Sequence, residues 1–285
     1  MRSYSSLVCA MLGQHPAMYG LPELNLFMAD TLAAVIKKLK LIRPQSLHGL
    51  LRAVAQVEYH AQTTDTVDQA NAWLQRHAHW NSGQFFAFLA ERTGSAILID
   101  KSPSTGLNPA NLRRMYHTFP KAHFLHLVRH PRPTCNSIHQ LQQKTARGRS
   151  ANAASDLSPE QLWLKINRNI LAFTERLPPG QAMLIQGERL LAQPELYLRQ
   201  IVDWLGLNSA SQNLAAMLHP EQSPYAFIGP PNALFGNDPN FLRNPGYSKR
   251  SIPTPQLEGP LEWKNDQADR FSASTRHLAR RLGYH

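Results

Sequence analysis

Apolar side chains recur at helical spacing through most of residues 31–92. They return every three or four positions with polar residues between them, which places one apolar face along each helix. Lys37, Lys38 and Lys40 mark the polar face of the first helix, and Thr64-Asp65 is a candidate cap for the third. The pattern predicts a block of helices at residues 31–41, 47–59, 63–77 and 84–92.

Shorter apolar runs have the length and composition of strands. They lie at residues 96–99, 123–128 and 182–186, and each is followed at once by polar or charged residues. The first two are expected to be buried. Helical patterns separate the runs, as they do in an open α/β sheet whose parallel strands are joined by helices. Polar residues at the carboxyl ends of such strands are candidates for a binding site.

The run at residues 123–128 ends on Arg129, a turn follows at His130-Pro131, and a helix is expected from about Pro133. A strand, a cation and a helix start in this order hold a phosphate in many open α/β sheets. Arg129 would supply a bidentate fork, and Ser137, about two helical turns on, could face the same anion. The alternative is an exposed arginine that merely ends a core strand.

Later segments alternate between helices and irregular chain. Residues 144–155 are polar and small and are expected to form a mobile loop. Ser158-Pro159 has the form of a helix start, and the helical pattern returns at residues 194–205. From residue 220 proline and glycine become frequent, although five aromatic residues between positions 225 and 247 indicate packing rather than a solvated linker. Trp263 is expected to head a C-terminal helix.

The composition limits the class of protein. With 285 residues the chain can form one domain over 1–285, and its formal charge is +11. The basic residues are dispersed, so nucleic-acid binding is the weaker reading, and an anionic nucleotide or an acidic partner such as a carrier protein explains the charge better. No apolar run is long enough to cross a membrane, and Cys9 and Cys135 lie in apolar surroundings, so a cytoplasmic location is expected.

Specific motifs carry a resemblance to PAPS-dependent sulfotransferases. Residues 2–7, Arg-Ser-Tyr-Ser-Ser-Leu, resemble the loop that binds the 5′-phosphosulfate in that family, and no Gly-Lys pair of a Walker A loop occurs anywhere. Asp100-Lys101-Ser102-Pro103 resembles a second motif, and Arg129 with Ser137 resembles the pair that binds the 3′-phosphate. Residues 236–241, Gly-Asn-Asp-Pro-Asn-Phe, resemble a segment of polyketide-associated members. The pattern is closest to bacterial polyketide-associated and tyrosylprotein-type sulfotransferases.

The resemblance implies a fold and an activity. The fold would be a P-loop-like, doubly wound parallel sheet flanked by helices, with a helical insertion at about 31–92 and an irregular lid at about 220–285. The reaction would move a sulfuryl group from PAPS, leaving PAP, to a hydroxyl of a small molecule or of an acceptor on an acidic acyl carrier protein. No metal ion is needed, and neither a nucleic acid nor a membrane is an expected partner.

The resemblance also implies residue roles. Glu23 would be the general base, with Lys101 and Arg2 stabilising charge on the sulfuryl group. The expected donor-binding residues are Arg2, Ser3, Tyr4, Ser5, Ser6, Leu7, Arg129, Ser137, Phe241 and Arg243.

The chain departs from the family pattern at several positions. Tyr4 stands where glycine is usual, and Gln186-Gly187 replaces an Arg-Tyr pair. Leu242 to Asn244 fill the place where a histidine sometimes occurs. The strand that normally feeds the first loop is not in the sequence, which favours a start recorded too late. These departures leave two alternatives open: a protein that binds PAP or PAPS without catalysis, and a basic nucleic-acid-binding protein.

Overall fold

The computed structural model describes residues 3–94, 96–146, 157–249, 252, 255–263 and 270–285. The chain divides into two compact units, each assembled from stretches distant in sequence. Unit 1 contains residues 1–4, 124–192 and 250–285, and unit 2 contains residues 5–123 and 193–249. No helix in the described part of the chain is both long enough and apolar enough to span a membrane.

Each unit contains a parallel pair of strands. In unit 2, β1 (Met18–Gly20) pairs with β2 (Ile97–Ile99), with Tyr19 opposite Leu98. In unit 1, β3 (Phe124–Val128) pairs with β4 (Ala182–Gln186), with His126 opposite Leu184. The fold is therefore mixed α/β, and β2, β3 and β4 lie where the apolar runs predicted them, whereas β1 was not predicted.

The described strands form two parallel pairs, one in each unit, which agrees with the predicted parallel arrangement, and the doubly wound, P-loop-like form of the sheet stays a prediction. The prediction that the strand at residues 96–99 is buried is wrong, because Ile97 is 40% exposed and the other two residues of β2 are half-buried.

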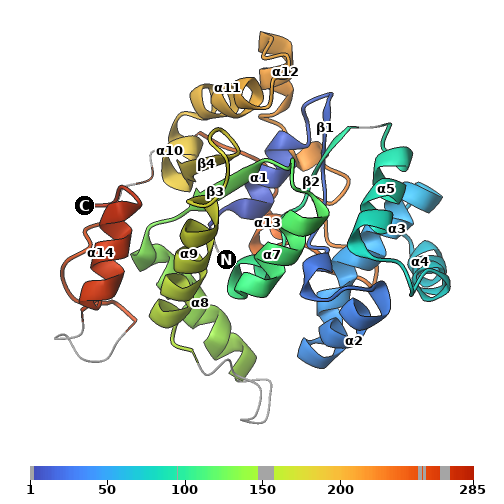
Figure 1. Cartoon of the computed structure of the whole chain (residues 1–285), viewed down its shortest axis with the longest axis horizontal. Coiled ribbons are helices and arrows are strands. Elements are labelled where there is room, and N and C mark those ends of the chain that lie inside the picture. Colours follow the sequence, from blue (N-terminus) through green and yellow to red (C-terminus); the bar gives the residue numbers. More distant parts are fainter. Residues whose placement is uncertain (1–2, 95, 147–156, 250–251, 253–254, 264–269) are drawn as a thin grey trace. The chain divides into compact units, whose positions relative to one another are not determined.

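The helices of unit 2 confirm the predicted helical block, and α2 to α5 lie together in Figure 1. Their apolar faces form one core around Leu50, Leu74 and Phe85, which are fully buried. Thr63, rather than the expected Thr64-Asp65, caps α4, because its side chain accepts from the Thr66 backbone N–H while the Thr66 hydroxyl accepts from the Thr63 N–H. The helices of unit 2 are α1 (Ser5–Leu12), α2 (Leu32–Ile42), α3 (His48–Tyr59), α4 (Thr64–Arg76), α5 (Ser82–Arg92), α6 (Pro103–Leu107), α7 (Pro109–Thr118), α11 (Pro194–Trp204), α12 (Ser211–Ala216) and α13 (Pro239–Arg243), with 3₁₀ turns at Leu26–Met28, Pro44–Leu47 and Pro220–Gln222.

The helices of unit 1 pack around β3 and β4, with α9 and α14 in contact (Figure 1). They are α8 (Pro131–Ala146), α9 (Pro159–Thr174), α10 (Gly187–Ala192) and α14 (Ala273–Arg281). Ser158 caps α9 as predicted, through a reciprocal pair of hydrogen bonds with Gln161. Helix α8 begins two residues earlier than expected, and it includes residues 144–146 of the predicted loop, whose remaining residues 147–155 lie outside the described part.

The C-terminal stretch after residue 220 is divided between the units. In unit 2 it has little regular structure, as predicted, yet it packs tightly, with Tyr225 only 1% exposed. The fully buried Arg52 of α3 fixes this stretch by donating from Nη1 to the Phe235 carbonyl at 3.0 Å and from Nε to Gln62 at 2.6 Å. In unit 1 the prediction that Trp263 heads the last helix is wrong, since α14 begins at Ala273 after a Ser272 cap.

Candidate active site

Lys101 is the centre of a polar cluster in unit 2. Its Nζ donates to Glu23 Oε1 at 2.8 Å, to Asn237 Oδ1 at 2.9 Å and to Ser6 Oγ at 3.0 Å. The Lys101 side chain is 10% exposed, whereas that of Glu23 is 29% exposed. All three ammonium hydrogens therefore have acceptors, and the carboxylate that neutralises the charge can be reached from solvent.

Four segments distant in sequence bring these side chains together. Lys101 follows β2, Ser6 lies in the first turn of α1, and the Glu23 backbone N–H donates to the Gly236 carbonyl at 2.7 Å. The Asp238 N–H donates to Ser6 Oγ at 3.1 Å, so that hydroxyl receives two hydrogen bonds. Three of the sequence motifs and Glu23 thus meet in one hydrogen-bonded group.

Glycine is needed where the backbones around Glu23 approach most closely. Gly49 of α3 lies so near the Glu23 backbone that a Cβ there would overlap the Glu23 carbonyl group. Gly236 has a φ of 124°, a region open mainly to glycine, and a Cβ there would lie 2.9 Å from Gly49 Cα. The two glycines allow α3 and the residue 236 segment to enclose Glu23.

Asp100 lies beside the cluster. Loss of solvent raises the pKa of its carboxyl to about 6, against the opposing effects of the Ser102 hydrogen bond and the Lys101 charge. Ser102 Oγ donates to Asp100 Oδ1 at 2.9 Å and accepts from the Asn25 N–H at 2.8 Å. Asp100 therefore fixes the turn after β2 that carries Lys101.

Arg129 is held at the end of β3 in unit 1. The Trp163 indole N–H donates to the Arg129 carbonyl at 3.1 Å, and the guanidinium carbon lies 4.4 Å from the centre of the Tyr4 ring. The chain then turns at His130 into α8, which carries Ser137. The predicted succession of strand, arginine, turn and helix is confirmed.

A buried carboxylate supports this turn from behind. Glu188, 4% exposed, accepts from the His130 backbone N–H and from the Tyr284 hydroxyl, both at 2.9 Å. Burial lowers the pKa of His130 to about 4, and the nearby Arg132 and Arg129 charges act in the same direction. Burial and the Glu188 charge raise the pKa of Tyr284, so its hydroxyl stays protonated and donates.

The other predicted site residues are distributed as follows. Ser3, Ser5 and Leu7 are half-buried near the start of α1, and Arg2 lies outside the described residues. Phe241 is buried against Ala10 and Leu242 in the core of unit 2, and Arg243 is exposed at the end of α13. Phe241 therefore supports the segment by packing rather than by presenting an open aromatic face.

Several residues of the candidate site were not predicted. Asn237 lies inside the recognised residue 236–241 motif, so its position in that motif was an available signal. Glu188 directly follows the Gln186-Gly187 pair, but Tyr284 is 96 positions further on, and no local pattern connects the two.

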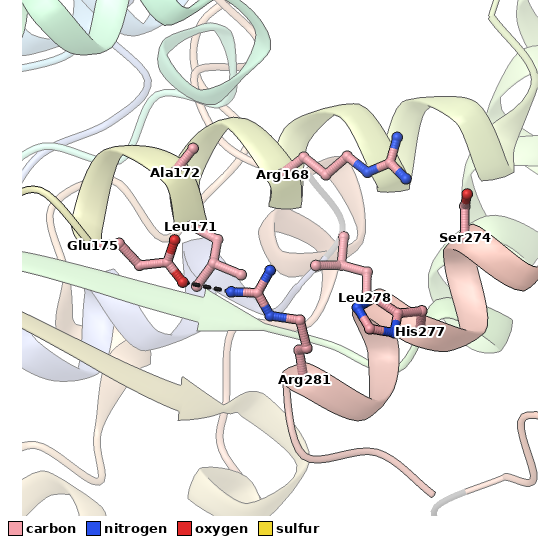
Figure 2. Close-up of a pocket in the computed structure, with 8 residues that line it drawn as sticks. All are labelled: Arg168, Leu171, Ala172, Glu175, Ser274, His277, Leu278 and Arg281. Atoms are coloured by element: carbon pink, nitrogen blue, oxygen red, sulfur yellow. Dashed lines mark hydrogen bonds and ion pairs between the residues drawn. The ribbon is translucent and has the colours of Figure 1, made fainter.

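A groove in unit 1 lies between α9 and α14, with a volume of about 320 Å³ (Figure 2). Arg281 of α14 reaches Glu175, which follows the last residue of α9, at 2.6 Å across it. None of the predicted site residues lines this groove, so it is not part of the candidate active site. Its lining consists of Arg168, Leu171, Ala172, Glu175, Ser274, His277, Leu278 and Arg281. Among the described residues, no group of three or more His, Cys, Asp or Glu side chains could hold a metal ion.

Comparison with known proteins places the chain in a family. A model described as "Sulfotransferase family" matches residues 1–211, about three quarters of the chain, so the protein belongs to the sulfotransferase family. The sulfotransferase domain from the curacin biosynthetic pathway is similar in structure, with a TM-score of 0.78, 24% identity and coverage of 100% of this chain and 95% of that one. The sulfotransferase domain from the Synechococcus PCC 7002 olefin synthase gives a TM-score of 0.77, 25% identity and coverage of 100% and 92%. No curated protein matches the chain.

Proposed function

We propose that this sulfotransferase moves a sulfuryl group from PAPS to an acceptor hydroxyl. The observation that carries the proposal is the Lys101 cluster, which joins the start of α1, Glu23, the turn after β2 and the residue 236–241 segment through hydrogen bonds of 2.7 to 3.1 Å. A cation, a carboxylate and a helix start in one group are the elements that sulfuryl transfer needs.

In the proposed step the acceptor oxygen attacks sulfur, and the bond from sulfur to the 5′-phosphate oxygen breaks. Glu23 takes the hydroxyl proton, since its carboxylate pairs with Lys101 at 2.8 Å and is accessible to solvent. Lys101 stabilises charge on the sulfuryl oxygens, and the backbone N–H groups at the start of α1 stabilise charge on the leaving phosphate. These residues carry out the step without a metal ion.

Lys101 must change partners for this step. Its three hydrogens are already directed to Glu23, Ser6 and Asn237, so a sulfuryl oxygen has to replace one of them. Replacing Glu23 would release the carboxylate to accept the proton of the acceptor. Donor binding would in this way both neutralise Lys101 and free the base.

The remaining donor contacts are assigned through the resemblance. Arg129 and Ser137 would bind the 3′-phosphate, and Arg2, Ser3, Tyr4, Ser5, Ser6 and Leu7 would form the 5′-phosphosulfate loop. Arg243 is a second cation for the donor, supported by its exposure at the end of α13. The packing of Phe241 holds that helix in place.

The acceptor is proposed to be a hydroxyl on a small molecule or on an acidic acyl carrier protein. The two similar structures are domains from a biosynthetic pathway and from an olefin synthase, and the net charge of +11 suits an acidic partner. A cytoplasmic setting is part of the proposal, and the two buried, free cysteines are compatible with it.

Calorimetric titration with PAP tests the donor site. We expect micromolar binding, about −8 kcal/mol, and roughly hundredfold weaker binding by Arg129→Ala because a charge-assisted contact to the phosphate is lost. Arg168→Ala is the matched control, since Arg168 is an exposed arginine of the same unit and has no proposed role. Absence of PAP binding by the wild-type protein would contradict the proposal.

Transfer from radiolabelled PAPS to a panel of hydroxyl acceptors, free and attached to an acyl carrier protein, tests catalysis. Labelled product that depends on Glu23 would support the enzyme. PAP binding with no transfer to any acceptor and no PAPS turnover would favour the alternative of a nucleotide-binding protein without catalysis.

A further inference from the structure

Tyr4 has a backbone conformation that aromatic residues rarely adopt. Its φ is 64°, in the left-handed region, where most side chains crowd the neighbouring backbone and glycine does not. Unfavourable conformations of this kind persist only where surrounding contacts require them, and they concentrate at functional sites. The contact that Tyr4 gains is with Arg129, whose guanidinium carbon lies 4.4 Å from the ring centre.

Gly187 provides the space for the Tyr4 ring. A Cβ on Gly187 would lie 2.8 Å from Tyr4 Cδ2, closer than such atoms approach in proteins, and 3.3 Å from the Ser3 carbonyl oxygen. A side chain on the first residue of α10 and the ring of Tyr4 therefore cannot occupy the same space. Any side chain at 187 would displace the ring or be displaced by it.

We propose that Tyr4 is a positioning residue that holds the Arg129 guanidinium for the anionic 3′-phosphate of the donor, and that Gly187 is the space it requires. The inference rests on the proposed function, since it takes Arg129 as the phosphate-binding residue. It adds that the affinity of that site depends on one aromatic side chain. In this chain the aromatic residue is at position 4, whereas the family pattern has a tyrosine at position 187.

The physical basis is the geometry of a guanidinium on a ring. The guanidinium carbon lies over the Tyr4 ring, and an aromatic face attracts a cation and so limits the positions that the arginine side chain can adopt. Holding the side chain before binding reduces the entropy lost when it engages a phosphate. The Trp163 bond to the Arg129 carbonyl fixes the backbone, and Tyr4 restrains the side chain.

A double-mutant cycle on PAP affinity tests the inference, with calorimetry and thermal unfolding of Tyr4→Gly, Gly187→Ala and the double variant. We expect Tyr4→Gly to weaken PAP binding about fivefold to tenfold without lowering Tm, because the unfavourable φ is relieved. Gly187→Ala should weaken binding similarly in the wild-type background and have no further effect when Tyr4 is glycine. Tyr4→Phe, which keeps the ring, should bind within about twofold of wild type.

The outcomes separate this inference from the proposed function. Wild-type PAP binding that Arg129→Ala abolishes, together with unchanged affinity in Tyr4→Gly, would overturn the positioning role and leave the donor site intact. Additive effects of the two substitutions would also overturn it, because the ring and the residue 187 side chain would then act independently. If Gly187→Ala destabilises the fold in the wild-type background, the comparison of Tyr4→Gly with Tyr4→Phe decides the question alone.

Discussion

The two cations central to the proposed chemistry are held in different ways. Lys101 in unit 2 directs all three of its hydrogens to side-chain oxygens, one of them the Glu23 carboxylate at 2.8 Å. Arg129 in unit 1 rests its guanidinium on an aromatic ring, and its carbonyl is fixed by an indole N–H. The charge of Lys101 is neutralised by a carboxylate that a ligand can replace. The position of the Arg129 guanidinium is instead fixed before the ligand binds.

This difference indicates separate tasks. Donor binding must displace Glu23 from Lys101, and this couples donor binding to release of the base. Substitutions of these two residues should therefore change the rate of transfer. A cation arranged in advance acts equally on bound donor and bound product, so its effects should appear in affinity. Substitutions in the two regions should therefore separate kcat from Kd.

The largest expected effect is that of Lys101→Ala on the rate. Loss of the cation should lower kcat about 10³-fold, because charge on the sulfuryl oxygens is no longer stabilised, while PAP affinity should change less than about threefold. Single-turnover transfer from PAPS measures it. Lys38→Ala removes an exposed amine of the same unit that donates to the Met28 carbonyl, and it should leave the rate unchanged. Equal losses in rate and PAP affinity would contradict the division of tasks.

Glu23→Gln should lower kcat about 10²-fold by removing the proton acceptor while its amide oxygen can still accept from Lys101. The measurement is the ratio of wild-type kcat to variant kcat, and the variant should retain its PAP affinity. Glu58→Gln, which alters a surface pair with Arg92, is the control. Full activity of the Glu23 variant would mean that another group takes the proton.

His130 should make the stability of the protein depend on pH. Its pKa is about 4 in the folded chain and about 6.5 when exposed, so the unfolded chain binds a proton that the folded chain does not as pH falls below 6.5. The free energy of unfolding should therefore decrease by about 2 kcal/mol between pH 7 and pH 5 from this group. His130→Asn keeps an acceptor for the Arg132 N–H and should remove that part of the decrease in urea titrations.

His126 serves as the internal reference for this measurement, because burial also lowers its pKa to about 4 and it remains in both proteins. An identical pH dependence in wild type and His130→Asn would show that His130 is protonated equally in both states.

The smallest expected effect is that of Tyr284→Phe. It removes a hydrogen bond to the buried Glu188 and should lower the free energy of unfolding by about 1 to 2 kcal/mol. The comparison is Tyr19→Phe in unit 2, which removes a neutral contact with the Tyr225 hydroxyl at 3.2 Å and should cost less. Denaturant unfolding of both variants measures the difference. A larger loss for Tyr19→Phe would contradict the importance given to the Glu188 carboxylate.

Local signals in the sequence predicted local structure well. Strand Ala182–Gln186 and the Ser158 cap of α9 lie where they were expected, because strand runs and cap residues act over a few positions. The same locality explains the Thr63 correction, since Thr63 and Thr64 are equally plausible caps until the hydrogen bonds with Thr66 are known.

Long-range pairing could not be predicted in this way. The hydrogen bond between Lys101 and Asn237 spans 136 positions. The space that Gly187 leaves for the Tyr4 ring depends on the three-dimensional fit of the two residues, which no sequence pattern encodes. The motifs identified Lys101, Glu23 and Ser6 as candidates, but only the fold shows that they share hydrogen bonds. Strand partners could not be predicted for the same reason, because apolar runs do not specify their neighbours.

The bond between Glu188 and Tyr284 has a consequence for the timing of folding during synthesis. A ribosome releases the chain from the N-terminus, so β3, Arg129 and Glu188 emerge well before residue 284 does. Until then the Glu188 carboxylate lacks its phenol donor, and the surface that α14 later covers on α9 stays open to water. The segments of unit 2 up to residue 123 can pack their helical core during that interval. We therefore expect the 3′-phosphate site to mature late in translation, after the helical core of the other unit.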